Sequence, residues 1–194
     1  MNGGDLAAEM RAALAALTEE HRAELLDAGI PRPLFGQFLI GAALIRLSGD
    51  GALYEPDPEG APAYLVPALV DDPATPESTV EQYEQLGALV DVVAWHPRHP
   101  ERWALRCGVA EWLGHIEPQY LDPAPVNIWR GPLSWFRAGC SGLVILGREP
   151  VDTYRIVAGL GGGALAEDRE HALTLRRILR RPWPLPRIEV ARAA

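Results

Sequence analysis

The most regular pattern in the chain covers residues 143–180, which read LVILGREPVDTYRIVAGLGGGALAEDREHALTLRRILR. Two short apolar runs, 143–146 and 164–166, have the length and composition of buried strands. Each run is followed by a stretch with helical spacing, 151–157 and 168–180. Alternating strands and helices are typical of a parallel β-α-β crossover, which is right-handed in nearly all proteins. We therefore predict a C-terminal β-α-β-α unit.

The N-terminal part predicts helices. Residues 5–17 place leucine and methionine at helical spacing, and Thr18 is suited to cap a second helix that Gly29 ends. A third helix is expected over 34–45, with Pro33 at its first position. The last two helices raise the alternative of a helix-turn-helix, but a recognition helix needs polar side chains for the base edges. This segment is mostly apolar, so we expect a buried core helix.

Strand signals dominate the middle of the chain. A Gly-Asp-Gly turn at 49–51 predicts a hairpin between 44–48 and 52–55. Further expected elements are a strand at 64–70, a short helix at 80–86, and an apolar strand at 88–95 on which 102–107 pairs back. The fold class is therefore α+β, with a helical N-terminal segment, central antiparallel strands and the C-terminal β-α-β-α unit.

Charge is distributed unevenly along what we expect to be a single domain, 1–194. Residues 1–128 and 129–194 are possible sub-lobes with formal charges of −13 and +5, against −8 for the whole chain. Such an asymmetry indicates a nucleic acid or an acidic partner, or a mutual attraction of the two halves. All 18 basic side chains are arginine, so lysine Schiff bases, a pyridoxal phosphate anchor and a Walker A lysine are excluded.

The predicted compartment is the cytoplasm. The first five residues contain no basic segment of a secretory signal, and the longest apolar run, 38–45, is shorter than a membrane helix requires. The two cysteines, Cys107 and Cys140, are too few for a disulfide framework and are expected to be free thiols. We expect no membrane partner.

The last predicted helix carries a concentrated group of arginines near its C-terminal end, namely Arg176, Arg177, Arg180 and Arg181. Cations at this end suit the helix dipole, and the same charges can neutralise several nucleic-acid phosphates. Three interpretations stay open at this stage. The arginines bind nucleic acid, they pair with the acidic front of the chain, or they are simply solvated.

A histidine and cysteine constellation, H-x2-H-x7-C-x7-H, is formed by His96, His99, Cys107 and His115. Imidazole and thiolate are zinc ligands, although this spacing matches no standard finger. The structural alternative is a rigid turn rich in proline between two strands. Arginines interleave with tryptophans through this region, which suggests either a groove for stacked bases or a core filled by large rings.

Charged residues follow both strands of the predicted β-α-β unit. Arg148 and Glu149 come after the first strand, and three carboxylates come after the second. Glu167, Asp168 and Glu170 therefore meet them at one edge of the sheet, where ligands of open α/β sheets bind. Clustered carboxylates bind Mg²⁺, and the arrangement is similar to the metal site of Toprim-type nucleases and primases. It departs from that family, because no acidic residue closes the first strand and no Asp-x-Asp pair follows the second. Capping of the last helix is the structural alternative.

Three segments, 95–105, 116–121 and 126–133, resemble a group of uncharacterised bacterial proteins associated with prophage-like elements. The resemblance brings no activity and no site residue with it. It implies a bacterial cytoplasm and a mobile-element context.

Two functional hypotheses follow. The first is a non-enzymatic accessory protein whose partner is a protein or a nucleic acid, with Arg176, Arg177, Arg180 and Arg181 as the contact and with no cofactor. The alternative is a metal-dependent or carboxylate enzyme that acts on a phosphate-containing substrate, with Zn or Mg as cofactor. Whether the chain is an enzyme is left open by the sequence.

Overall fold

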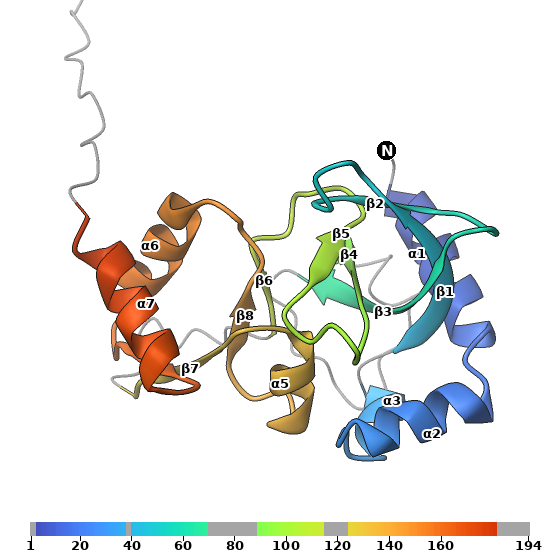
Figure 1. Cartoon of the computed structure of the whole chain (residues 1–194), viewed down its shortest axis with the longest axis horizontal. Coiled ribbons are helices and arrows are strands. Elements are labelled where there is room, and N and C mark those ends of the chain that lie inside the picture. The colour runs from blue at the N-terminus through green and yellow to red at the C-terminus, as the bar shows by residue number, and fades with distance from the viewer. Residues whose placement is uncertain (1–2, 38–39, 70–88, 115–123, 182–194) are drawn as a thin grey trace, which may run out of the picture.

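Two β-sheets lie next to each other, with helices packed at both ends of the molecule (Figure 1). The computed structural model describes residues 3–37, 40–69, 89–114 and 124–181. The first sheet has the strand order β2-β1-β3-β4-β5, and the second has the order β6-β8-β7-β9. The predicted α+β class is confirmed. The predicted helix at 80–86 lies outside the described residues.

Three helices open the chain: α1 (Gly3–Ala15), α2 (Glu19–Asp27) and α3 (Leu34–Gln37). The predicted cap of α2 is confirmed, because the Thr18 hydroxyl accepts the backbone N–H of His21. Gly29 follows the helix with φ at 86°, a conformation that only glycine adopts without strain.

The predicted helix over 34–45 is wrong. Helix α3 stops at Gln37, and β1 begins at Gly41. Gly41 lies so close to Ala13 on α1 that a Cβ atom would overlap it, and β1 pairs along β3. Tertiary pairing therefore determines the structure of an apolar run that helix and strand patterns fit equally well.

The first sheet is antiparallel throughout and confirms the predicted central strands. Its strands are β1 (Gly41–Leu47), β2 (Tyr54–Pro56), β3 (Ala61–Leu69), β4 (Leu89–Trp95) and β5 (Trp103–Leu105). The hairpin around residues 49–51 and the pairing of β5 back on β4 are as expected. One face of this sheet packs against α1, and the other packs against α2, α3 and the second half of the chain.

The second sheet contains the predicted β-α-β-α unit: β8 (Leu143–Ile145), α6 (Pro150–Gly159), β9 (Ala164–Ala166) and α7 (Arg169–Leu179). The two predicted strands run parallel but are not neighbours, because β7 (Val126–Trp129) lies between them and pairs in parallel with both. Helix α5 (Pro132–Arg137) connects β7 to β8, and β6 (Trp112–Leu113) adds an antiparallel edge.

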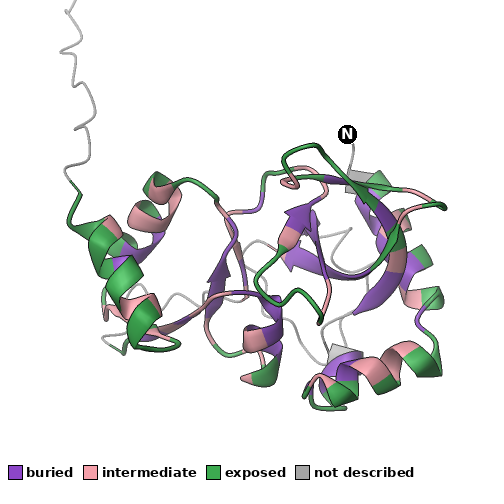
Figure 2. Ribbon diagram, in the orientation of Figure 1, coloured by how far each residue is buried: buried purple, intermediate pink, exposed green. Residues whose placement is uncertain are grey.

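The two sheets share one apolar core. Trp95 of β4 stacks on Phe136 of α5 with ring centroids 5.3 Å apart, and the same cluster includes Val93 of the first sheet and Val144 of the second. Figure 2 shows the buried residues running from α1 through the first sheet into β8. The charge boundary between residues 128 and 129 falls inside β7, so it does not mark the passage from one sheet to the other. Within the described ranges, every helix falls short of the length and apolar character that a membrane span requires.

Candidate functional site

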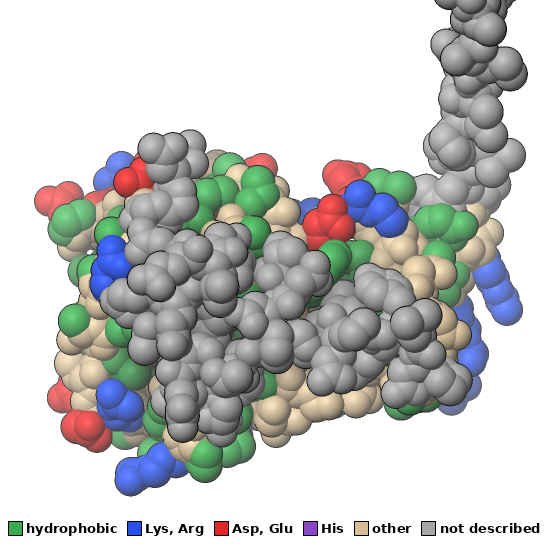
Figure 3. Space-filling view, turned by 180° about the vertical axis from the view of Figure 1, so that it is seen from behind, with side chains coloured by type: hydrophobic (Ala, Val, Ile, Leu, Met, Phe, Trp, Pro, Cys, Tyr) green, Lys and Arg blue, Asp and Glu red, His purple; other side chains and the backbone are tan. Residues whose placement is uncertain are grey.

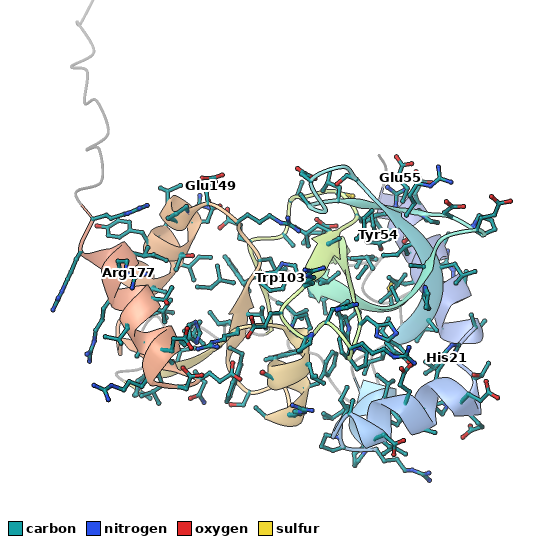
Figure 4. All side chains as sticks on the ribbon, viewed as in Figure 1. His21, Tyr54, Glu55, Trp103, Glu149 and Arg177 are labelled. Carbon is teal, nitrogen blue, oxygen red and sulfur yellow. The ribbon has the colours of Figure 1, made fainter. Side chains whose placement is uncertain are left out.

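Helix α7 has an inner face that packs toward the second sheet and an outer face that is basic. Asp168 caps its N-terminus by accepting the backbone N–H of His171 at 2.8 Å, and Leu175 is buried against the second sheet. The predicted site residues Arg176, Arg177, Arg180 and Arg181 are all exposed at the C-terminal end. Figure 4 labels Arg177 on this helix, and Figure 3 shows basic side chains along the edge of the molecule that α7 forms.

The four predicted arginines at the C-terminal end of α7 make no ion pair with any acidic side chain in the described part of the chain. Attraction between the acidic front and the basic back runs instead through other arginines. Arg155 lies 2.7 Å from Glu111, and Arg130 lies 3.5 Å from Glu101. The structure therefore offers no support for pairing of the α7 arginines with the acidic front.

Arg130, which directly follows β7, forms ion pairs with carboxylates from two separate parts of the chain. Its guanidinium lies 2.7 Å from Asp168, 3.6 Å from Glu170 and 3.5 Å from Glu101. Its backbone N–H donates to Glu167, which also accepts the hydroxyl of Ser134 at 2.8 Å. The N–H of His171, and beyond it Arg130, hold the pKa of Asp168 below its ordinary value. The sequence predicts the carboxylates at this edge but does not predict Arg130 and Ser134 among them.

The same contacts bear on the predicted metal-binding edge. Glu167, Asp168 and Glu170 do gather at the carboxyl ends of the parallel strands, as expected. The cation among them is the guanidinium of Arg130, and Asp168 is the cap of α7. In the described ranges, no group of three or more histidine, cysteine or acidic side chains is arranged to hold a metal ion.

The predicted zinc ligands are not brought to one place. His96 contacts the ring of Tyr64 with centroids 5.8 Å apart, on the sheet face that packs against α2. Cys107 packs with the cluster on the opposite, α1-facing side, and burial raises the pKa of its thiol. His99 is exposed on the turn after His96, and His115 lies outside the described residues. His96 and Cys107 therefore cannot share a metal ion in this fold.

A cleft of about 950 Å³ lies between the first sheet and the C-terminal helices. Trp95 and Trp103 face each other in the register of β4 and β5, and both line this cleft. Figure 4 places the labelled Trp103 at the centre of the molecule, between the two sheets. The indole N–H groups of both residues are enclosed and have no acceptor among the described residues. From the other side, the cleft is lined by Trp129, Arg130 and the inner face of α7.

The aromatic residues divide between the two interpretations of the sequence. Trp95, Trp135 and Phe136 are buried in the shared core, which is the structural interpretation. Trp103 and Trp129 are only half-buried and line the cleft together with Arg102 and Arg130, so rings and arginines share this surface as the stacking interpretation expects. Tyr120 lies outside the described residues.

Comparisons with protein-family models, with curated proteins and with solved structures gave no match.

Proposed function

We propose that this protein is a nucleic-acid-associated accessory protein that contacts the phosphate backbone through the outer face of α7. The observation that carries the proposal is the exposure of Arg176, Arg177, Arg180 and Arg181 together, with no acidic partner among the described residues. Guanidinium groups that make no ion pair in the described part of the chain can bind phosphate oxygens, which arginine contacts in a bidentate manner.

The charge of the whole chain makes the position of these arginines decisive. A net charge of −8 repels a polyanion, so nucleic acid approaches only where positive charge is concentrated. Each phosphate that an arginine neutralises releases counterions, and the affinity therefore falls steeply as salt is added. Contacts of this kind position the protein on the backbone and carry no base sequence information. We expect binding that tolerates many sequences and is sensitive to salt.

The experiment is a binding titration with fluorescently labelled single-stranded and double-stranded 20-mers at low salt. The variant Arg176→Gln, Arg177→Gln, Arg180→Gln, Arg181→Gln removes four charges from α7. The control Arg11→Gln, Arg22→Gln, Arg32→Gln, Arg46→Gln removes the same charge from the acidic front. Thermal unfolding of each variant verifies that the fold is intact.

We expect the α7 variant to lose at least about tenfold in affinity, while the control changes much less. Equal losses in the two variants would show that only the net charge matters and would contradict the proposal. Absence of binding by the unmodified chain at low salt would also contradict it.

Among the described residues, no observation specifically favours the alternative of a metal-dependent or carboxylate enzyme. His96 and Cys107 lie on opposite faces of the first sheet, and Arg130, Ser134 and the first turn of α7 engage the carboxylates after β9. The bacterial cytoplasm and the mobile-element context stay predictions of the sequence.

A further inference from the structure

The central cleft lies at a special point of the second sheet. The chain leaves β7 for β8 on one side and then crosses to β9 on the other side, so the direction of winding reverses beside β7. In open parallel sheets, ligands bind in the crevice outside the carboxyl ends of the strands at such a reversal. Trp129 and Arg130 at the end of β7, and Gly147 and Arg148 after β8, line the cleft at this edge.

Arg148 holds the two sides of the cleft together. Its guanidinium reaches from the second sheet to the first and donates to the carbonyl oxygens of Gly51 at 2.5 Å and Trp103 at 2.9 Å. These bonds tie the β1-β2 turn and β5 to the end of β8. The two sides of the cleft are therefore bridged by hydrogen bonds, and its volume of about 950 Å³ lies within the range of small-molecule and cofactor sites.

The walls of the cleft combine flat rings with a guanidinium that makes no ion pair in the described ranges. The half-buried indole of Trp103 is an apolar ring surface with an N–H donor that has no acceptor in the described part of the chain. Arg130 is neutralised by carboxylates and Arg148 by carbonyl oxygens. Arg102 lines the cleft, is exposed, and makes no ion pair with a described residue. Arg102 directly precedes Trp103 in the chain, and both residues line the cleft.

We propose that this cleft binds a nucleobase together with its phosphate. The base lies against the indole of Trp103, where stacking is tolerant of base identity, and the phosphate pairs with Arg102. The ligand arrives as a free nucleotide or as the phosphorylated end of a single strand, which share this chemistry. This proposal does not rest on the outer face of α7, because Trp103 lies on β5 and Arg102 lies on the turn before β5.

The experiment is isothermal titration of the full chain with AMP, GMP, CMP and UMP, and with a 5′-phosphorylated dinucleotide. Ribose 5-phosphate is the ligand without a base, and adenosine is the ligand without a phosphate. Arg102→Gln removes the phosphate contact, with Arg32→Gln as a matched exposed control. Thr174→Trp fills the cleft from the exposed inner side of α7, with Leu173→Trp on the neighbouring exposed position as its control.

We expect saturable nucleotide binding that Arg102→Gln weakens about tenfold, the effect of one charge-assisted hydrogen bond. Thr174→Trp is expected to abolish it, and the two controls are expected to remain within about twofold. The α7 variant without Arg176, Arg177, Arg180 and Arg181 keeps nucleotide binding even where it loses long oligonucleotides, so the two proposals fail separately. Tighter binding of the dinucleotide than of the mononucleotides supports the single-strand end as the source, and the reverse supports the free nucleotide.

Three results would overturn the proposal. The first is absence of binding by any nucleotide at millimolar concentration in a chain that circular dichroism shows to be folded. The second is binding that Thr174→Trp leaves unchanged. The third is equal affinity for ribose 5-phosphate and the nucleotides, which would show that the base makes no contact.

Discussion

The guanidinium of Arg130 lies 2.7 Å from the carboxylate of Asp168, and this contact joins the residue after β7 to the residue that caps α7. It fixes the start of α7 at the carboxyl edge of the second sheet. One side of the helix consequently faces the cleft with His171 and Thr174, and the other side presents the arginines outward. Both proposed binding surfaces depend on this placement of α7.

The contact between Arg130 and Asp168 predicts a measurable coupling. Asn at position 168 keeps an oxygen that can cap α7 but carries no charge. We expect Arg130→Gln and Asp168→Asn each to lower the unfolding temperature, and the double variant to lose less than the sum of the two. A double-mutant cycle in urea checks this. The more exposed pair Arg155 and Glu111 is the comparison and is expected to couple more weakly. Additive effects at Arg130 and Asp168 would contradict the prediction.

Replacement of the buried Asp91 by Asn is expected to cause a large loss of stability. This fully buried carboxylate on β4 accepts the backbone N–H groups of Val92, Cys107 and Val109 at 2.8 Å and of Ala110 at 3.2 Å. Asp91→Asn turns one acceptor into a donor that faces other donors. We expect a loss of about 2–4 kcal/mol in the free energy of unfolding, measured by urea denaturation. The exposed Asp27→Asn is the control. A change below about 0.5 kcal/mol at Asp91 would show that the loop does not need this charge.

Two histidines predict a loss of stability in mild acid. Burial lowers the pKa of His96, against the opposing effect of Glu24, and burial also lowers the pKa of His171. The unfolded chain therefore takes up protons near pH 6.5 that the folded chain does not bind, and stability falls as the pH drops below that value.

The check is the urea midpoint between pH 8 and pH 5. The pKa of Glu24 is lowered by the hydroxyl of Tyr64, so its contribution is lost only at lower pH, outside this window. In His96→Asn with His171→Asn, an amide oxygen replaces the ring nitrogens that accept the N–H groups of Arg98 and Glu167. We expect this double variant to have a flatter pH dependence. The same slope as the unmodified chain would contradict the assignment.

The turn before β8 is expected to require glycine at position 142 for steric reasons. Both Gly142 and Gly163 have φ in the left-handed region, at 86° and 82°. A Cβ atom at Gly142 would overlap the carbonyl oxygen of Asn127 on β7, whereas the space beside Gly163 is open. We expect Gly163→Ala to cost about 1 kcal/mol, the backbone penalty alone, and Gly142→Ala about 2–4 kcal/mol. Equal losses in thermal or urea unfolding would show that the turn moves away from β7.

Elements with strong local signals could be predicted from the sequence. Thr18 and Asp168 both stand directly before helical spacing and both cap a helix. The Gly-Asp-Gly turn at 49–51 lies in the expected hairpin, and β8 and β9 run parallel as expected. In these places, the residues that determine the structure are neighbours in the chain.

The remaining features depend on contacts between distant residues. The strand β7, Val126–Trp129, was not predicted. Its sequence signal is weak, because only Val126 and Ile128 alternate as apolar residues that the structure buries. Arg130 meets Asp168 from 38 positions away, which no local pattern reveals. Pro33 and the apolar pattern favour a helix over 34–45, and nothing in the local sequence reveals that α1 lies against Gly41.

The salt dependence of oligonucleotide binding shows whether the arginines at the end of α7 contact phosphates. For a duplex 20-mer, the logarithm of the affinity is plotted against the logarithm of the salt concentration for the unmodified chain, for the α7 variant and for the front-half control. Each phosphate contact contributes about −0.9 to this slope. We predict that the α7 variant has a slope shallower by about 2–4 units, while the control keeps the slope of the unmodified chain. An α7 variant with an unchanged slope would show that these arginines do not contact the phosphates and would contradict the proposed function.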